Sequence, residues 1–266
     1  VLLSTITIAT TLVACQNTQT QTQTEATSQV QAQQSPPAKP GGEEFGGSDQ
    51  VTQGEAATNL TTDATVTGET YESTGDDENA LRVTGATVKL DGVTINKTAG
   101  ATSNTENGDF YGMNAGFLAT DGATVTITNS TVNTTAQNGN GVFSYGSGTT
   151  VNVSDTTITT TKDNSGGIQT TGGAAMNATN LTVNTAGNSS AAIRTDRGGG
   201  TVVVDKGTYT STGYNSPAVY STANITVKNA TLNAENSEAL VIEGQNSITL
   251  ENTNVTGNMS STEGSS

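Results

Sequence analysis

The chain of 266 residues carries 24 acidic and 9 basic side chains and no histidine, and 31% of its residues are hydrophobic. A formal charge of −15 argues against nucleic acid as a partner, because nucleic acid requires clustered Lys and Arg. With no histidine and a single cysteine, the chain alone cannot build the usual zinc, haem, Ser-His or Cys-His sites, so we expect no metal and no cofactor. Such a composition is typical of disorder unless its few apolar residues are placed periodically.

Residues 1–14 form an apolar stretch that is too short to span a bilayer and ends in small residues before Cys15. The segment Leu12-Val13-Ala14-Cys15 resembles a bacterial lipobox. That resemblance implies cleavage before Cys15, lipidation of its thiol, and a protein anchored in the membrane at the cell surface. We therefore interpret residues 1–15 as the remnant of a lipoprotein signal peptide; the alternative is a lone buried cysteine. The missing initiator Met and basic segment suggest truncation at this end.

Residues 16–58 have the composition of a disordered polar tether, with alternating Gln and Thr, then Pro36-Pro37 and Pro40-Gly41-Gly42. A flexible chain of this length has a root-mean-square extension of roughly 35 to 40 Å, enough to hold a folded body away from a membrane.

From residue 79 onward, aliphatic residues fall into three rows that recur every 21 to 26 residues or so, apart from one first step of 37. The first row is Leu81, Leu118, Phe143, Ile168, Ile193, Val219 and Leu240. The second row is Val88, Val125, Val151, Met176, Val203, Ile225 and Ile248, with a one-residue ambiguity at some positions. The third row is Ile95, Val132, Ile158, Val183, Tyr209, Leu232 and Val255.

Three short strands per repeat, each with inward aliphatic residues, predict an all-β fold: a parallel β-helix of about seven to eight coils over residues 59–266. Parallel crossovers are right-handed in nearly all proteins, so we expect a right-handed coil. Leu60, Val66 and Tyr71 indicate a leading coil. The chain stops after the third strand of a coil without a covering helix, which suggests truncation at the C-terminus as well.

Asn and Asp residues recur in the predicted turns, where their side chains favour left-handed conformations and can bond one another in a stack. Three residues before the third row stand Asn129, Asp155, Asn180, Asn229 and Asn252, with Gly92 and Lys206 as exceptions. Before the first row stand Asn164, Asn188, Asn215 and Asn236. We assign these residues a structural role.

Together, the coils, the asparagine stack and the lipobox resemble the pectin-lyase-like superfamily, and within it the adhesin-like and carbohydrate-binding β-helix lipoproteins of gut Firmicutes. The resemblance covers residues 60–266 and involves the architecture, not a catalytic motif. It implies contact with an extracellular polysaccharide or host glycan, bound along the outer face of the first sheet.

If the first row points inward, the residues that follow it point outward. They are Arg82, Ala119, Ser144, Gln169, Arg194, Tyr220 and Val241. Gln169, Arg194 and Tyr220 would offer an amide, a guanidinium and an aromatic face to a sugar, with Asp196 and Arg197 in the turn beyond. The alternative is a solvated face with one Arg-Asp pair.

An insertion at residues 98–115 brings Phe110, Tyr111 and Met113 to one edge of the same sheet. These side chains could form a sugar platform, or fold down as a cap over apolar surface. The acidic run Asp76-Asp77-Glu78 lacks the alternating oxygen ligands of a calcium loop, so we expect a solvated turn there.

Three functions fit the sequence. The first is a non-catalytic, surface-anchored module for adhesion or polysaccharide binding. The second is a polysaccharide lyase or hydrolase; a hydrolase needs two carboxylates across a groove, and the predicted outward stack contains none. The third is binding to ice or a crystal surface by a Thr-rich face, which the irregular mixing of Asn with Thr and the bulk of Tyr209 disfavour.

Overall fold

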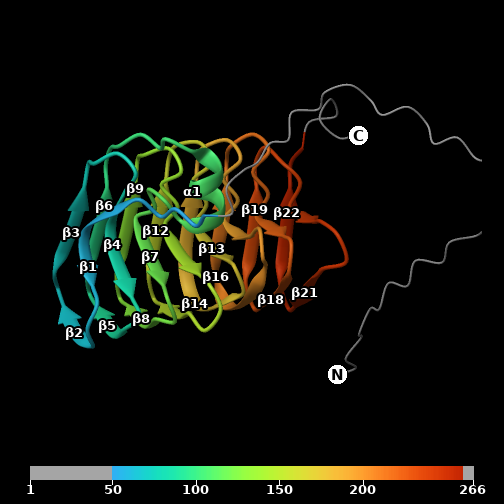
Figure 1. The fold of residues 1–266 in the computed structure, drawn as a ribbon. Helices are drawn as coiled ribbons and strands as arrows, with labels where there is room; N and C mark the ends of the chain where they lie inside the picture. The colour runs from blue at the N-terminus through green and yellow to red at the C-terminus, as the bar shows by residue number, and fades with distance from the viewer. Residues whose placement is uncertain (1–49, 260–266) are drawn as a thin grey trace, which may run out of the picture. The chain divides into compact units, whose positions relative to one another are not determined.

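Each coil of this protein consists of three short strands joined by bends, and about eight coils stack in the computed structural model, which describes residues 50–259 (Figure 1). The predicted signal peptide 1–15, with Cys15, and the predicted tether up to residue 49 lie outside the described residues. The first strand, β1 (Glu55–Leu60), begins within the predicted tether 16–58, so the β-helix starts four residues earlier than the predicted residue 59.

Every strand pairs in parallel with the equivalent strand of the next coil. The first sheet consists of β1, β4 (Glu78–Thr84), β7 (Phe117–Thr120), β10 (Val142–Tyr145), β13 (Ile168–Thr171), β15 (Ile193–Thr195), β17 (Val219–Ser221) and β20 (Leu240–Ile242).

The second and third sheets join where single strands, β14 (Ala174–Thr185) and β16 (Gly200–Ser211), run through the bend between them. The other strands of the second sheet are β2 (Ala64–Thr67), β5 (Thr87–Asp91), β8 (Thr124–Thr128), β11 (Thr150–Ser154), β18 (Asn224–Lys228) and β21 (Ser247–Glu251). The other strands of the third sheet are β3 (Thr70–Ser73), β6 (Thr94–Lys97), β9 (Thr131–Thr134), β12 (Thr157–Thr160), β19 (Thr231–Ala234) and β22 (Asn254–Gly257).

The third predicted row is confirmed at every position. Its members pair in register from Tyr71 through Tyr209 to Val255, and those from Ile95 to Leu232 are almost fully buried. A single file of apolar side chains therefore runs along the axis of the coil, as the periodicity predicts. The stacked side chains supply a continuous core from very few apolar residues per coil.

The first row is wrong at two positions. Leu81 pairs with Phe117, and Phe117 with Val142, so Leu118 and Phe143 lie one residue out of register and point outward. Ala119 and Ser144, which we predicted to point outward, instead point inward and are buried.

The second row is wrong at one position, whereas the predicted leading coil is confirmed, since Leu60, Val66 and Tyr71 all pack against the core. Val202 pairs with Met176 and points inward, whereas Val203 points outward. In the leading coil, Leu60 pairs with Val83 and Val66 with Leu90, two residues along the strand from the row members Leu81 and Val88 and on the same inward side.

The Asx residues before the third row form the predicted bend. Asn129, Asp155, Asn180, Lys206, Asn229 and Asn252 all have positive φ, between 47° and 66°. Their side chains also bond from coil to coil: Asn180 Nδ2 donates to Asp155 Oδ1 at 2.7 Å, and Asn252 Nδ2 donates to Asn229 Oδ1 at 2.9 Å. The stack both permits the bend and joins neighbouring coils.

The bend before the first sheet follows the same rule with two exceptions, at Asn188 and at Asn236, neither of which has a positive φ. Asn164 and Asn215 have positive φ, whereas in the coil between them Ser189 takes this conformation in place of Asn188.

Buried hydroxyls close the bend between the third and first sheets, a feature that the sequence analysis missed. Ser165, Ser190 and Ser216 stack there: the main-chain N–H of Ser165 donates to Ser190 Oγ, and that of Ser190 to Ser216 Oγ, both at 2.9 Å. Thr160 Oγ1 and Thr185 Oγ1 donate across the same bend to the carbonyls of Ser165 and Ser190. Main-chain groups that would otherwise be buried without partners are thus satisfied.

Between residues 50 and 259, no helix is long and apolar enough to cross a membrane.

Candidate functional site

The outward face of the first sheet carries the predicted site residues in register. Gln169 pairs with Arg194, and Arg194 with Tyr220, so the three side chains occupy successive coils of one column. Leu118 and Phe143 precede them in this column and form an apolar pair between Arg82 and Gln169, while Val241 follows Tyr220.

The insertion folds over the apolar pair of this column as helix α1 (Thr105–Tyr111), with Asn104 as its N-cap and Gly112 as its C-cap. Ala115, Leu118 and Phe143 form a small buried cluster beneath it. A Cβ added to Gly112 would lie 2.7 Å from Leu118 Cδ1, so the chain crosses this cluster in close contact. The insertion thus forms a cap over apolar surface, one of the two arrangements that the sequence allows.

Side chains from the sheet bind the C-terminal carbonyls of α1. Gln169 Nε2 donates to Asp109 O and Thr171 Oγ1 to Phe110 O, both at 2.6 Å, while Asn79 Nδ2 donates to Gly112 O at 2.9 Å. These bonds satisfy carbonyls that a helix end leaves without partners. Gln169, predicted as a ligand-binding residue, is fully buried under the helix and holds it in place.

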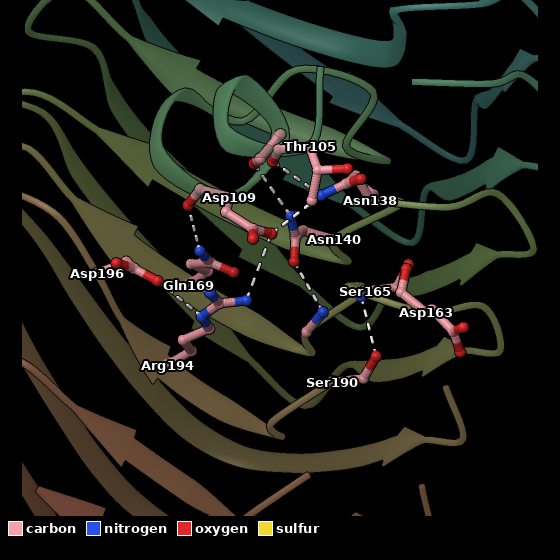
Figure 2. Close-up of polar contacts among 12 residues, drawn as sticks. Thr105, Asp109, Asn138, Asn140, Asp163, Ser165, Gln169, Ser190, Arg194 and Asp196 are labelled. Carbon is pink, nitrogen blue, oxygen red and sulfur yellow. Dashed lines mark hydrogen bonds and ion pairs between the residues drawn. The ribbon is translucent and has the colours of Figure 1, made fainter. Parts of the chain in front are cut away.

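Arg194 joins α1 to the sheet through two carboxylates (Figure 2). Its Nη2 lies 2.5 Å from Asp196 Oδ2, and its Nη1 lies 3.5 Å from Asp109 Oδ1. Asn138 Nδ2 also donates to Asp109 Oδ1, at 2.9 Å. The predicted Arg-Asp pair is present, and a second carboxylate, which the sequence analysis did not anticipate, comes from α1. The charge of Arg194 is therefore already balanced within the protein.

The aromatic side chains of the insertion pack on the protein. The guanidinium carbon of Arg197 lies 4.0 Å from the centre of the Phe110 ring, within range of a cation–π contact. Tyr111 packs edge-on against Tyr145, with ring centres 5.6 Å apart. Phe110 and Tyr111 are both partly buried.

A pocket of about 380 Å³ opens beside this cluster on the outward face. Its volume lies within the range typical of small-molecule sites. Arg194, Tyr220 and Val241 form its floor from successive coils, and Asp109 of α1 lies at one side. The other lining residues are Asn164, Ser189, Ala191, Asn215, Pro217, Glu238 and Glu243.

The pocket walls are acidic. Three carboxylates, of Asp109, Glu238 and Glu243, face a single guanidinium, that of Arg194. This arrangement favours a neutral or cationic ligand over an anionic one. The outward column itself contains no carboxylate, as expected; the carboxylates of the pocket come from α1 and from the last coil.

Three groups at the pocket have perturbed pKa values. Burial acts to lower the pKa of Arg194, but the carboxylates of Asp109 and Asp196 outweigh it, so that pKa is raised. Burial raises the pKa of Asp109 above its ordinary value, even though Arg194 and the hydrogen bond from Asn138 act in the opposite direction. Burial, and then the adjacent carboxylate of Glu243, raise the pKa of the Tyr220 hydroxyl far above its ordinary value. Tyr220 therefore remains a protonated donor at any physiological pH.

The acidic run Asp76-Asp77-Glu78 receives donors from neighbouring segments. Asp76 Oδ1 accepts from the N–H of Ala101 and Asp77 Oδ1 from that of Ser103, both at 2.7 Å. The run forms a turn at Asp76 and Asp77 with Asp76 exposed, as expected, and its hydrogen bonds also fix the start of the insertion. Within residues 50–259, no group of three Cys, Asp or Glu side chains could hold a metal ion.

A buried lysine lies near this run. Lys97 is fully buried at the end of β6, where its ammonium donates to Ser73 Oγ at 3.2 Å and to the carbonyl of Gly75. Equivalent positions in later coils hold Thr134 and Thr160, whose hydroxyls bind turn carbonyls. Burial lowers the pKa of Lys97 to about 8.

No family model, no curated protein and no solved structure matches this chain.

Proposed function

We propose that the protein is a surface-anchored, non-catalytic β-helix module that binds an uncharged polysaccharide or host glycan in the pocket at Tyr220. The pocket itself carries the proposal: it is open, large enough for a sugar, and formed by side chains that neighbouring coils hold rigidly. Anchoring through Cys15 and a cell-surface location rest on the lipobox resemblance. The relation to pectin-lyase-like adhesin lipoproteins rests likewise on shared architecture.

Tyr220 and the pocket rim supply what sugar recognition requires. An aromatic face packs against the C–H groups of a pyranose ring, while the Tyr hydroxyl donates to a ring hydroxyl. Asn164 and Asn215 offer amides that both donate and accept, and Ser189 offers a hydroxyl. Hydrogen bonds from such groups fix the orientation of a ligand in a largely preformed site.

The balanced charge of Arg194 supports the proposal of an uncharged ligand. A guanidinium that is free would favour uronic acids, but this one already contacts Asp109 and Asp196. A uronate entering the pocket would meet Glu238 and Glu243 without a free cation to offset them. Neutral sugars avoid this repulsion, so we assign the pocket to them.

A glycan array tests this proposal. The chain should bind neutral glycans more strongly than uronic-acid polymers, and Tyr220→Ala should weaken binding by about tenfold or more, the usual effect of removing a central aromatic contact. Tyr214→Ala removes an exposed tyrosine that does not line this pocket, and serves as the matched control. Binding to no glycan, or equal loss in both variants, would refute the proposal.

Hydrolysis is a second candidate, because the pocket holds carboxylates. A glycoside hydrolase needs one protonated and one ionised carboxyl group. The raised pKa of Asp109 suits the acid, and Glu243 would be the base. Release of reducing ends from neutral polysaccharides, abolished in Glu243→Gln, would replace the binding function with this one.

A further inference from the structure

The outward face of the third sheet carries two columns of short, uncharged polar side chains. One column runs from Thr94 to Asn254 and the other from Asn96 to Thr256, with one residue of each column in every strand of this sheet from β6 to β22. The first column is threonine in every coil from Thr70 to Thr231, and the second contains only Asn and Thr from Asn96 onward. We call these two columns, from β6 to β22, the Thr face.

The absence of charge distinguishes the Thr face from the rest of the solenoid. The second sheet has outward positions in the same coils and strands of the same kind, and these include Lys89, Asp91, Asp205, Lys228 and Glu251. The preference of β-strands for Thr applies equally to both sheets, so it does not explain why only one of them lacks charges. The chain has 33 charged side chains (24 acidic and 9 basic). A face that carries none of them is suited to contact with an uncharged partner.

The Thr face is also regular and available for binding. Its strands pair in register without a bulge, and Tyr209, which we expected to disrupt the face, points inward and is fully buried. In the described part of the chain, no hydrogen bond engages the hydroxyl of Thr157, Thr182 or Thr208, all of which are exposed. Because Thr is stiff at χ1, binding would order these side chains at little entropic cost.

From these observations we infer that the Thr face adsorbs to an ordered surface of linear, uncharged polysaccharide, with the glycan chains parallel to the solenoid axis. Neighbouring coils are about 4.8 Å apart, and the two columns are separated by about 6.7 Å along each strand. The coil spacing is close to the length of one pyranose unit in an extended glycan. Each coil therefore presents a hydroxyl and an amide or second hydroxyl to one sugar unit.

Ice is a poorer fit to the same face. The second column mixes amides with hydroxyls, and Asn133 Nδ2 donates to Asn96 Oδ1 at 3.1 Å, which makes the column chemically uneven. Sugar hydroxyls are compatible with this mixture, because amides and hydroxyls both donate and accept hydrogen bonds. The inferred surface lies on a different sheet from the Tyr220 pocket and does not depend on it.

Adsorption to microcrystalline cellulose and α-chitin powder tests the inference, using the full chain. The triple variant Thr157→Lys, Thr182→Lys, Thr208→Lys places three charges on the Thr face, and should reduce adsorption at least about tenfold, because each ammonium must lose water against a neutral surface. The matched control places three lysines in the same coils on the second sheet, at Asn152, Asn177 and Val203, and should adsorb like the wild type.

Each outcome decides the inference. Selective loss in the Thr-face variant, with adsorption retained in the control and in Tyr220→Ala, supports it and separates it from the pocket. Loss in Tyr220→Ala alone would assign adsorption to the pocket and overturn the inference. The inference would also be overturned if the wild type adsorbed to neither polymer, or if both lysine variants lost adsorption equally. Thermal hysteresis without adsorption would overturn it as well. Unchanged circular dichroism of both lysine variants serves as the check on folding.

Discussion

Lys97 makes the stability of the coil depend on pH, and the direction follows from its burial. Burial disfavours the ammonium, so the pKa is about 8 in the folded chain against an ordinary 10.5. Between these values the unfolded chain binds more protons than the folded chain, so the free energy of unfolding increases as pH rises. The burial cost is largest below pH 8 and disappears above pH 10.5. The full difference between the two pKa values corresponds to about 3 kcal/mol in the free energy of unfolding. About 2 kcal/mol of it should appear between pH 7 and pH 9.5.

Urea unfolding followed by circular dichroism measures this effect. Lys97→Met removes the titrating group, so the stability difference between wild type and variant should change by about 2 kcal/mol in favour of the wild type between pH 7 and pH 9.5. Comparing the two proteins cancels the titration of tyrosines that they share. Lys89→Met changes an exposed lysine of the neighbouring strand β5 and should show no such change. A pH-independent difference between wild type and Lys97→Met would refute the reasoning.

Three further predictions concern the fold and the helix over the site. Ser190→Ala leaves a buried N–H without its acceptor and should lower the free energy of unfolding by about 1–3 kcal/mol, whereas Ser154→Ala, at a partly exposed strand position, should cost little. Gly112→Ala should lower the free energy of unfolding by about 1–3 kcal/mol more than Gly122→Ala. Both glycines have φ near 79°, but only a side chain at position 112 would clash with a neighbouring side chain. Urea unfolding measures the serine pair and the glycine pair alike. Arg194→Met leaves two carboxylates without their cation and should destabilise by about 3 kcal/mol, measured as a lower urea midpoint.

The sequence is sufficient to predict the fold because its apolar residues alternate strictly where one side of a strand faces solvent. The third row has a single aliphatic or aromatic residue between polar neighbours, as at Thr157-Ile158-Thr159, and its register is confirmed in full. Alternation leaves only one choice of inward side chain there. The errors in the other rows have a physical cause.

Those errors fall where apolar residues are adjacent. Phe117-Leu118 and Val142-Phe143 are apolar on both sides of the strand, because the inner residue fills the core and the outer one lies under α1. Three consecutive valines at 202–204 give the same ambiguity. A pattern of alternation cannot show which member of such a run points inward.

The candidate site was only partly predictable. The column of Gln169, Arg194 and Tyr220 follows from the repeat, since equivalent positions of successive coils stack. The carboxylate of Asp109 does not, because it lies 85 residues before Arg194 on a short helix whose position depends on tertiary contacts. The acidic character of the pocket, on which the proposal of a neutral ligand rests, therefore required the structure.

Calorimetric titration of the full chain with neutral and uronic-acid oligosaccharides tests the central claim most directly. We predict that a neutral oligosaccharide binds with an affinity that hardly changes with salt concentration, and that Tyr220→Ala removes the heat of binding. Preferential binding of the uronate, weakened by salt, would contradict the claim, because it would require a free cation where the structure has a neutralised one.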